Sequence, residues 1–166
     1  MKANVTWAGG RTFIGGVEAG HKIVLGNAHG DSLKPGPSPM ELILIGTGGC
    51  SAYDVVHILE KGREAVEDCI CELTAERAES EPKVFTKIDM QFTVKGRGLD
   101  PKKVERAINL SVEKYCSASA MMAATATLTH DFEIVETCAE RPASSSARAS
   151  ACSATMRQPA KNPISS

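Results

Sequence analysis

The sequence predicts an α+β fold with a mostly antiparallel sheet, and three patterns support this fold class. Two runs, at 69–76 and 87–94, alternate between apolar and polar residues, as strands with one buried face do. A stretch from about Pro39 to Lys61 is long and apolar enough for a helix. The expected helices follow strands in groups instead of alternating with them, which favours α+β over a parallel α/β sheet.

Three short strands are expected before the first helix. Residues 3–7 and 12–16 form a hairpin that turns at Gly9-Gly10, and residues 21–25 add a third strand. A loop rich in Gly, Pro and Asn follows from 26 to 39. Pro39 suits the first turn of the next helix, and Gly62 suits its C-terminal cap.

The second half of the chain supplies the longer strands and two more helices. The first alternating run places Cys69 and Cys71 on its inner face, and the second has its inner face at Ile88, Met90, Phe92 and Val94. Asp100-Pro101 has the composition of a helix start. Helical spacing then joins Val104, Ala107, Ile108, Val112 and Tyr115 on one face. A short helix over 117–126 and a strand over 128–135 complete the domain.

Composition divides the chain into a domain and a tail. The chain has 166 residues, 42% of them hydrophobic and 23% charged. Residues 139–166 are mostly small or polar, so they cannot bury enough surface to offset the entropy of ordering. We expect one domain over 1–138 and a disordered tail over 139–166, with a cloning or read-through extension as the alternative.

Charge and terminal sequence exclude several classes of protein. A formal net charge of -1 argues against a nucleic acid or an anionic membrane as the main partner. The N-terminus lacks the pattern of a signal peptide, and no segment approaches the ~18 apolar residues needed to span a bilayer. We therefore expect a cytoplasmic protein, in which the six cysteines begin as free thiols.

The helix over 39–61 predicts a homodimer. Its first half is apolar on every side, and a helix of this kind is buried all round. About 23 residues would run about 35 Å, more than one small sheet can cover. Gly46, Gly48 and Gly49 each cost about 1 kcal/mol in a helix and suggest close approach to a neighbouring helix. Cys50 would lie near the seam of this dimer; the alternative is a monomer with a glycine-broken segment.

Cys50 and Cys116 are the candidate redox pair. A cysteine of ordinary pKa, about 8.5, needs a cation or an aimed donor to become a thiolate. Arg11 is the favoured cation for Cys50, with Lys34 and Arg63 as alternatives. Cys116 lies where two helices meet, and free N–H groups there could stabilise a thiolate. We expect the sulfurs to meet across a subunit boundary, where one is oxidised to sulfenic acid and the other condenses with it. The alternative is that both are small core residues.

Other polar residues are weaker candidates for a role in the active site. Glu41 lies in the first helical turn, where it either benefits from the helix dipole or holds a catalytic arginine. Asp54 and His57 share the helix face of Cys50, and a polar rim or dimer contact is the favoured interpretation. Core packing is favoured for Cys69 and Cys71. No C-x-x-C, histidine pair or complete phosphate loop occurs, so we expect no metal and no other cofactor.

The run from Pro37 to Cys50, together with 114–117 (Lys-Tyr-Cys-Ser), resembles the OsmC/Ohr family, and within it the YhfA-like branch. The resemblance covers roughly residues 1–136. It implies an intertwined homodimer with two active sites at its interface, which reduces organic hydroperoxides through thiols. On this likeness Cys50 is the peroxidatic thiol and Cys116 the resolving thiol. An N-terminal arginine and a glutamate at the start of the cysteine helix assist, roles for which Arg11 and Glu41 are the candidates.

The chain departs from that pattern at one position and leaves two functions open. The family's glutamate position, ten residues before Cys50, holds Met40, and Glu41 would point about 100° round the helix. The first function is a peroxidase with a pocket lined by Met40, Tyr53 and Met121 and with a dithiol reductant. The second is a non-catalytic dimer that senses oxidant or binds a small apolar ligand, which the loss of the glutamate favours.

Overall fold

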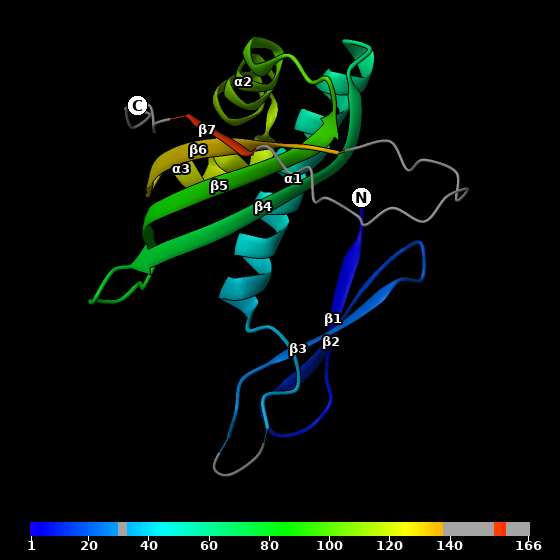
Figure 1. The fold of residues 1–166 in the computed structure, drawn as a ribbon. Coiled ribbons are helices and arrows are strands. Elements are labelled where there is room, and N and C mark those ends of the chain that lie inside the picture. The colour runs from blue at the N-terminus through cyan, green and yellow to red at the C-terminus, as the bar shows by residue number, and fades with distance from the viewer. Residues whose placement is uncertain (30–32, 138–154, 159–166) are drawn as a thin grey trace, which may run out of the picture. The chain divides into compact units, whose positions relative to one another are not determined.

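The computed structural model describes residues 1–29, 33–137 and 155–158, which divide into two compact units, Met1–Gly46 and Thr47–Ser166 (Figure 1). Helix α1, Pro39–Lys61, begins in the first unit and ends in the second. Each unit has one sheet, and the helices follow strands in groups, so the predicted α+β fold is confirmed.

The first unit is a three-stranded antiparallel sheet in the order β1-β2-β3. Its strands are β1 (Ala3–Trp7), β2 (Thr12–Val17) and β3 (Lys22–Gly26), which confirms the hairpin and the third strand. The turn between β1 and β2 needs glycine, because Gly9 and Gly10 have φ of 99° and 54°. The indole N–H of Trp7 donates to the carbonyl of Gly10 at 3.0 Å and closes this turn.

The second unit has a four-stranded sheet in the order β4-β5-β6-β7. Its strands are β4 (Ala65–Arg77), β5 (Phe85–Arg97), β6 (Thr127–Glu136) and β7 (Thr155–Gln158). β5 and β6 pair in parallel, since helices connect them; the other two pairings are antiparallel. The residues predicted for the inner face of β5 are all buried. Within the predicted tail, β7 is a strand, and the rest of 139–166 lies outside the described residues, as does Cys138.

A widened helical turn lies before Cys116. Asp100 caps α2, Pro101–Leu110, by accepting a hydrogen bond from the N–H of Lys102 at 2.9 Å. The π-helical segment η1, Ser111–Tyr115, then adds residues to the turn, and helix α3, Ser117–Ala123, follows. The widened turn moves Tyr115 away from the buried face, where the helical spacing had placed it, and leaves this side chain 52% exposed.

Helix α1 has the predicted bounds, and within one chain it is buried along one face only. Its buried residues form one stripe: Thr47, Gly48, Ser51, Val55 and Leu59. The other faces are open within one chain, with Ile45 58% and Tyr53 71% exposed, and their cover by a second subunit stays a prediction. The helix ends at Lys61 as expected, but the left-handed conformation falls on Arg63, with φ of 58°, and not on Gly62.

The glycines of α1 serve different surfaces. A Cβ at Gly48 would lie 2.4 Å from Cδ1 of Leu73, so this glycine lets the helix pack on β4 of its own chain. That contact corrects the expectation that Gly48 serves a neighbouring subunit. A Cβ at Gly49 would meet nothing within 4 Å.

By length and composition alone, α1 could also cross a membrane. Its mean hydropathy reaches 1.5 over an 18-residue window, so the expectation that no segment meets this criterion is wrong. Small residues such as Gly48 and Ser51 lower the number of apolar residues in this segment but lower its mean hydropathy only slightly. The core helix of a soluble protein passes the same test, and part of α1 packs on the sheet.

Candidate active site

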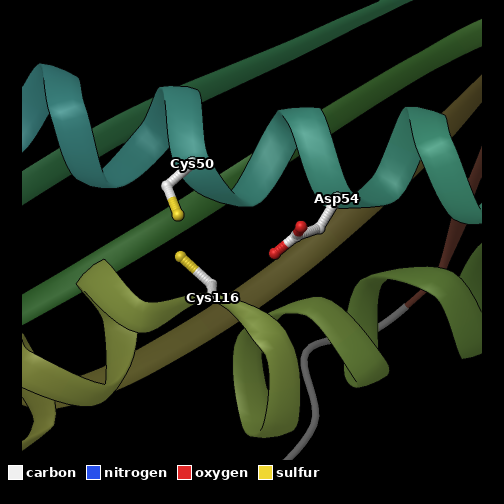
Figure 2. Close-up of side chains that lie close together, drawn as sticks. All are labelled: Cys50, Asp54 and Cys116. Atoms are coloured by element: carbon white, nitrogen blue, oxygen red, sulfur yellow. The ribbon is translucent and has the colours of Figure 1, made fainter.

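The side chains of Cys50 and Cys116 point toward each other between α1 and the link that precedes α3 (Figure 2). The two Sγ atoms and a carboxylate oxygen of Asp54 all lie within 4.8 Å of one another. All three residues belong to the second unit of one chain. The fold therefore pairs the two predicted cysteines, but within a subunit, which corrects the expectation of a meeting across a subunit boundary.

Hydrogen-bond donors converge on Cys116, which is only 2% exposed. Cys116 is the N-cap of α3, and its Sγ accepts from the N–H of Ser119 at 3.3 Å. The hydroxyl of Ser51, on α1, donates to the same sulfur at 3.2 Å. The helix junction thus supplies the N–H group that the sequence predicted there, and a serine from a second helix adds to it.

These donors separate the two thiols in acidity. Burial acts to raise the pKa of Cys116, but hydrogen bonds from Ser119, Ser51 and Cys50 outweigh it, so the pKa is lowered. For Cys50 a hydrogen bond from the backbone of Ala118 acts in the lowering direction. Burial and the neighbouring Cys116 and Asp54 outweigh that bond and raise the pKa of Cys50. The pair therefore holds its first negative charge on Cys116, with the thiol of Cys50 as a donor.

A buried serine network fixes the two helical segments in this arrangement. The hydroxyls of Ser51 and Ser119 lie 3.1 Å apart, and the hydroxyl of Ser111 donates to the carbonyl of Ser51 at 3.0 Å. All three serines are buried. None of the three was among the site residues predicted from the sequence. Ser119 had a signal, because it lies three residues after Cys116, where an N-cap side chain meets the backbone. Ser51 had none, since its contacts cross 60 residues or more.

Asp54 belongs to the site and not to a polar rim. It lies one helical turn after Cys50 on α1, so its carboxylate reaches the same space as the sulfurs (Figure 2). Its Oδ2 is buried and has no hydrogen-bond partner among the described residues. The i+4 spacing was the available signal, but nothing in the sequence showed that Cys116 would face it.

Glu41 serves the start of α1. Its carboxylate accepts from the N–H and hydroxyl of Ser38 at 2.7 and 2.9 Å and forms an ion pair with Lys34. The hydroxyl of Ser38 accepts in return from the N–H of Glu41 at 3.3 Å, which completes a capping box. Lys34 and then Ser38 lower the pKa of Glu41 to about 2. Among the described residues of this unit, the hydrogen bonds to the carboxylate of Glu41 come from Lys34 and Ser38 and not from Arg11.

The residues predicted to line a substrate pocket lie largely on the surface. Tyr53 is 71% exposed and stacks on His57, with ring centroids 6.1 Å apart, and Met121 is 65% exposed. Met40 is half-buried in the first unit. These side chains would line an enclosed pocket only if another surface covered them.

Comparisons with known proteins agree on one family. The family of OsmC-like proteins matches residues 29–131. Protein YhfA of Escherichia coli strain K12 is 47% identical over 135 residues, which cover 81% of this chain and 98% of YhfA.

Solved structures share the fold. A hypothetical protein from Aquifex aeolicus VF5 is 32% identical, with a TM-score of 0.72 over 82% of this chain and 96% of that chain. The organic hydroperoxide resistance protein OhrB of Bacillus subtilis is 18% identical, with a TM-score of 0.55 over 80% of this chain and 98% of that chain. At that identity OhrB supports the fold alone.

Proposed function

This chain belongs to the OsmC-like protein family, and on that premise we propose that it reduces organic hydroperoxides with the thiols of Cys50 and Cys116. The observation that carries the proposal is the approach of the two sulfurs to within 4.8 Å, with hydrogen-bond donors gathered on one of them. The choice of substrate is an analogy from the fold, since two solved proteins that share it are described as organic hydroperoxide resistance proteins.

In the first step Cys50 attacks, because it is half-buried whereas Cys116 is almost fully enclosed. The Cys116 thiolate takes the proton of the Cys50 thiol, and the resulting Cys50 thiolate attacks the distal oxygen of ROOH. The O–O bond breaks, Cys50 becomes a sulfenic acid, and the leaving alkoxide takes the proton back from Cys116 to give ROH. The pair thus supplies both the base and the acid for this step.

In the second step the restored Cys116 thiolate attacks the sulfur of the Cys50 sulfenic acid and displaces hydroxide. A Cys50–Cys116 disulfide forms, and the peroxide has received two electrons in all. The hydrogen bonds from Ser51 and Ser119 favour the ionised form of Cys116, which is the form this step requires. An external dithiol then reduces the disulfide by thiol–disulfide exchange.

The remaining site residues act in a dimer. Proteins of this family are typically dimeric, and a partner subunit would cover Tyr53, Met121 and the open face of α1 at Gly49. We propose that Met40, Tyr53 and Met121 then form the apolar lining for the organic group of the peroxide. Arg11 is the proposed cation for the Cys50 thiolate, and Glu41 assists by fixing the start of the cysteine helix.

Family members are soluble, and we place the reaction in the cytoplasm, where thiols are kept reduced. A second function, a non-catalytic dimer that senses oxidant or binds a small apolar ligand, is favoured by one observation. Met40 occupies the position of the family's glutamate, and the neighbouring Glu41 is engaged by Ser38 and Lys34.

A turnover assay separates the two functions. Wild-type protein and Cys50→Ser receive cumene hydroperoxide and dihydrolipoamide, with Cys69→Ser as the matched cysteine control. We expect many turnovers by the wild type and Cys69→Ser and a loss of at least about a thousandfold in Cys50→Ser, because the attacking thiolate is removed. Oxidation that stops after one equivalent would indicate the sensor, and equal peroxide consumption by Cys50→Ser would refute both functions.

A further inference from the structure

We propose that the reduced protein binds one Zn²⁺ per chain between the sulfurs of Cys50 and Cys116 and the carboxylate of Asp54. The donor atoms of these three side chains all lie within 4.8 Å of one another (Figure 2). Zinc bonds of about 2.3 Å to sulfur and about 2.0–2.2 Å to oxygen would place tetrahedral ligand atoms about 3.5–3.8 Å apart. Side-chain rotations that move the ligand atoms by about 1 Å would therefore bring them to these separations without moving the helices.

The scaffold presents the ligands in a form that suits a metal. Cys50 and Asp54 lie four residues apart on one face of α1, the spacing by which a single helix supplies two zinc ligands. Cys116 comes from the N-cap of α3, so the third ligand is held by a separate element. The donors on the Cys116 sulfur, Ser51 and Ser119, would remain in place and orient it.

Asp54 provides an independent indication. Its Oδ2 is buried and lacks a hydrogen-bond partner among the described residues, although an unsatisfied buried oxygen costs about 1–3 kcal/mol. A cation between the carboxylate and the sulfurs would satisfy this atom. Two sulfurs with one carboxylate suit Zn²⁺ better than Mg²⁺ or Ca²⁺, which prefer oxygen ligands, and three protein ligands leave a fourth position for water.

The absence of a zinc motif in the sequence is consistent with such a site, because the fold brings the third ligand from a distant segment. This proposal does not depend on peroxidase activity: it needs only the reduced thiols and Asp54. Zn²⁺ would displace the two thiol protons, and a Cys50–Cys116 disulfide would remove both sulfur ligands. Binding is therefore expected only in the reduced state.

The test is an anaerobic titration of reduced, metal-free protein with Co²⁺, followed by displacement with Zn²⁺. We expect one Co²⁺ per chain, with a sulfur-to-cobalt charge-transfer band and the intense visible bands of four-coordinate Co²⁺. Cys50→Ser should reduce the charge-transfer band by at least about half, because one of the two sulfur ligands is removed, and Asp54→Asn should weaken binding at least about tenfold. Cys71→Ser, the matched control, should bind as the wild type does.

Three results would overturn the proposal: no charge-transfer band in the wild type at millimolar Co²⁺, an unchanged band in Cys50→Ser, or equal affinity in Asp54→Asn. Circular dichroism verifies that each variant is folded. If one variant fails to fold, diamide-oxidised wild type replaces it, and retained binding by the oxidised protein would also contradict the site. No peroxide is present, so a protein without turnover can still pass this test.

Discussion

Two cysteine pairs in the same unit differ in almost every property that controls thiol reactivity. Cys69 and Cys71 are two residues apart on the inner face of β4, where burial raises their pKa to about 11 and about 12. Cys50 and Cys116 are distant in sequence, yet their sulfurs meet, and donors from Ser51 and Ser119 lower the pKa of Cys116. Nearness in sequence thus says little about reactivity, whereas donors around the sulfur decide it.

The largest expected difference between the pairs is in their reaction with iodoacetamide at pH 8. A pKa of about 11 leaves roughly 0.1% thiolate at that pH, and one of about 12 leaves roughly 0.01%. The lowered pKa of Cys116 lets it ionise at a lower pH than an ordinary thiol does. Mass spectrometry with isotope-coded reagent should show Cys50, the accessible member of its pair, modified at least about tenfold faster than Cys69 or Cys71, because the adjacent Cys116 thiolate can take its proton.

The rates should converge as the pH rises, because Cys69 and Cys71 become ionised only near pH 11–12. Equal rates for the two pairs at pH 8 in the folded protein would contradict the comparison. The unfolded protein in urea is the control, in which all cysteines should react alike.

A smaller effect is expected when one donor is removed. Ser51→Ala takes away the hydroxyl that bonds the Cys116 sulfur at 3.2 Å. We expect the pKa of Cys116 to rise by about 1, equivalent to about 1.4 kcal/mol, which lowers the thiolate fraction at pH 7 about tenfold. Near-ultraviolet thiolate absorbance measured against pH checks this. Ser117→Ala, at the exposed neighbour of Cys116, is the control and should leave the titration unchanged.

The smallest effect concerns the other pair. Cys71→Ser places a hydroxyl on the half-buried inner face of β4, so it should cost about 1 kcal/mol of unfolding free energy. Peroxide turnover should stay within a factor of two of the wild type, since Cys71 takes no part in the reaction. Urea denaturation and the turnover assay together check this. A large loss of turnover in a folded Cys71→Ser protein would contradict the statement that only the Cys50–Cys116 pair takes part in the reaction.

Much of the fold could be predicted because its signals are local. The alternation along β4 and β5, the Asp100 cap and the bounds of α1 follow from neighbouring residues. The exposure of Tyr115 could not be predicted, because the π-helical turn at 111–115 shifts the helical period and no sequence pattern marks this turn.

Of the site, the sequence predicted only the two cysteines. Cys50 and Cys116 carried motifs, but the contacts of Ser51 and the position of Asp54 depend on how α1 packs beside the start of α3. The prediction that Gly48 contacts a neighbouring subunit is wrong for the same reason, since the sequence could not show that Leu73 occupies the space beside it. Glu41 was placed correctly in the first turn, whereas its bonds to Ser38 and Lys34 needed the structure.

The most direct test of the central claim is disulfide mapping after one equivalent of cumene hydroperoxide. We expect a single disulfide, between Cys50 and Cys116 of the same chain, so that non-reducing electrophoresis shows no covalent dimer. Cys69 and Cys71 should remain reduced. An interchain disulfide, a bridge that includes Cys71, or free thiols at both Cys50 and Cys116 after the peroxide is consumed would contradict the account.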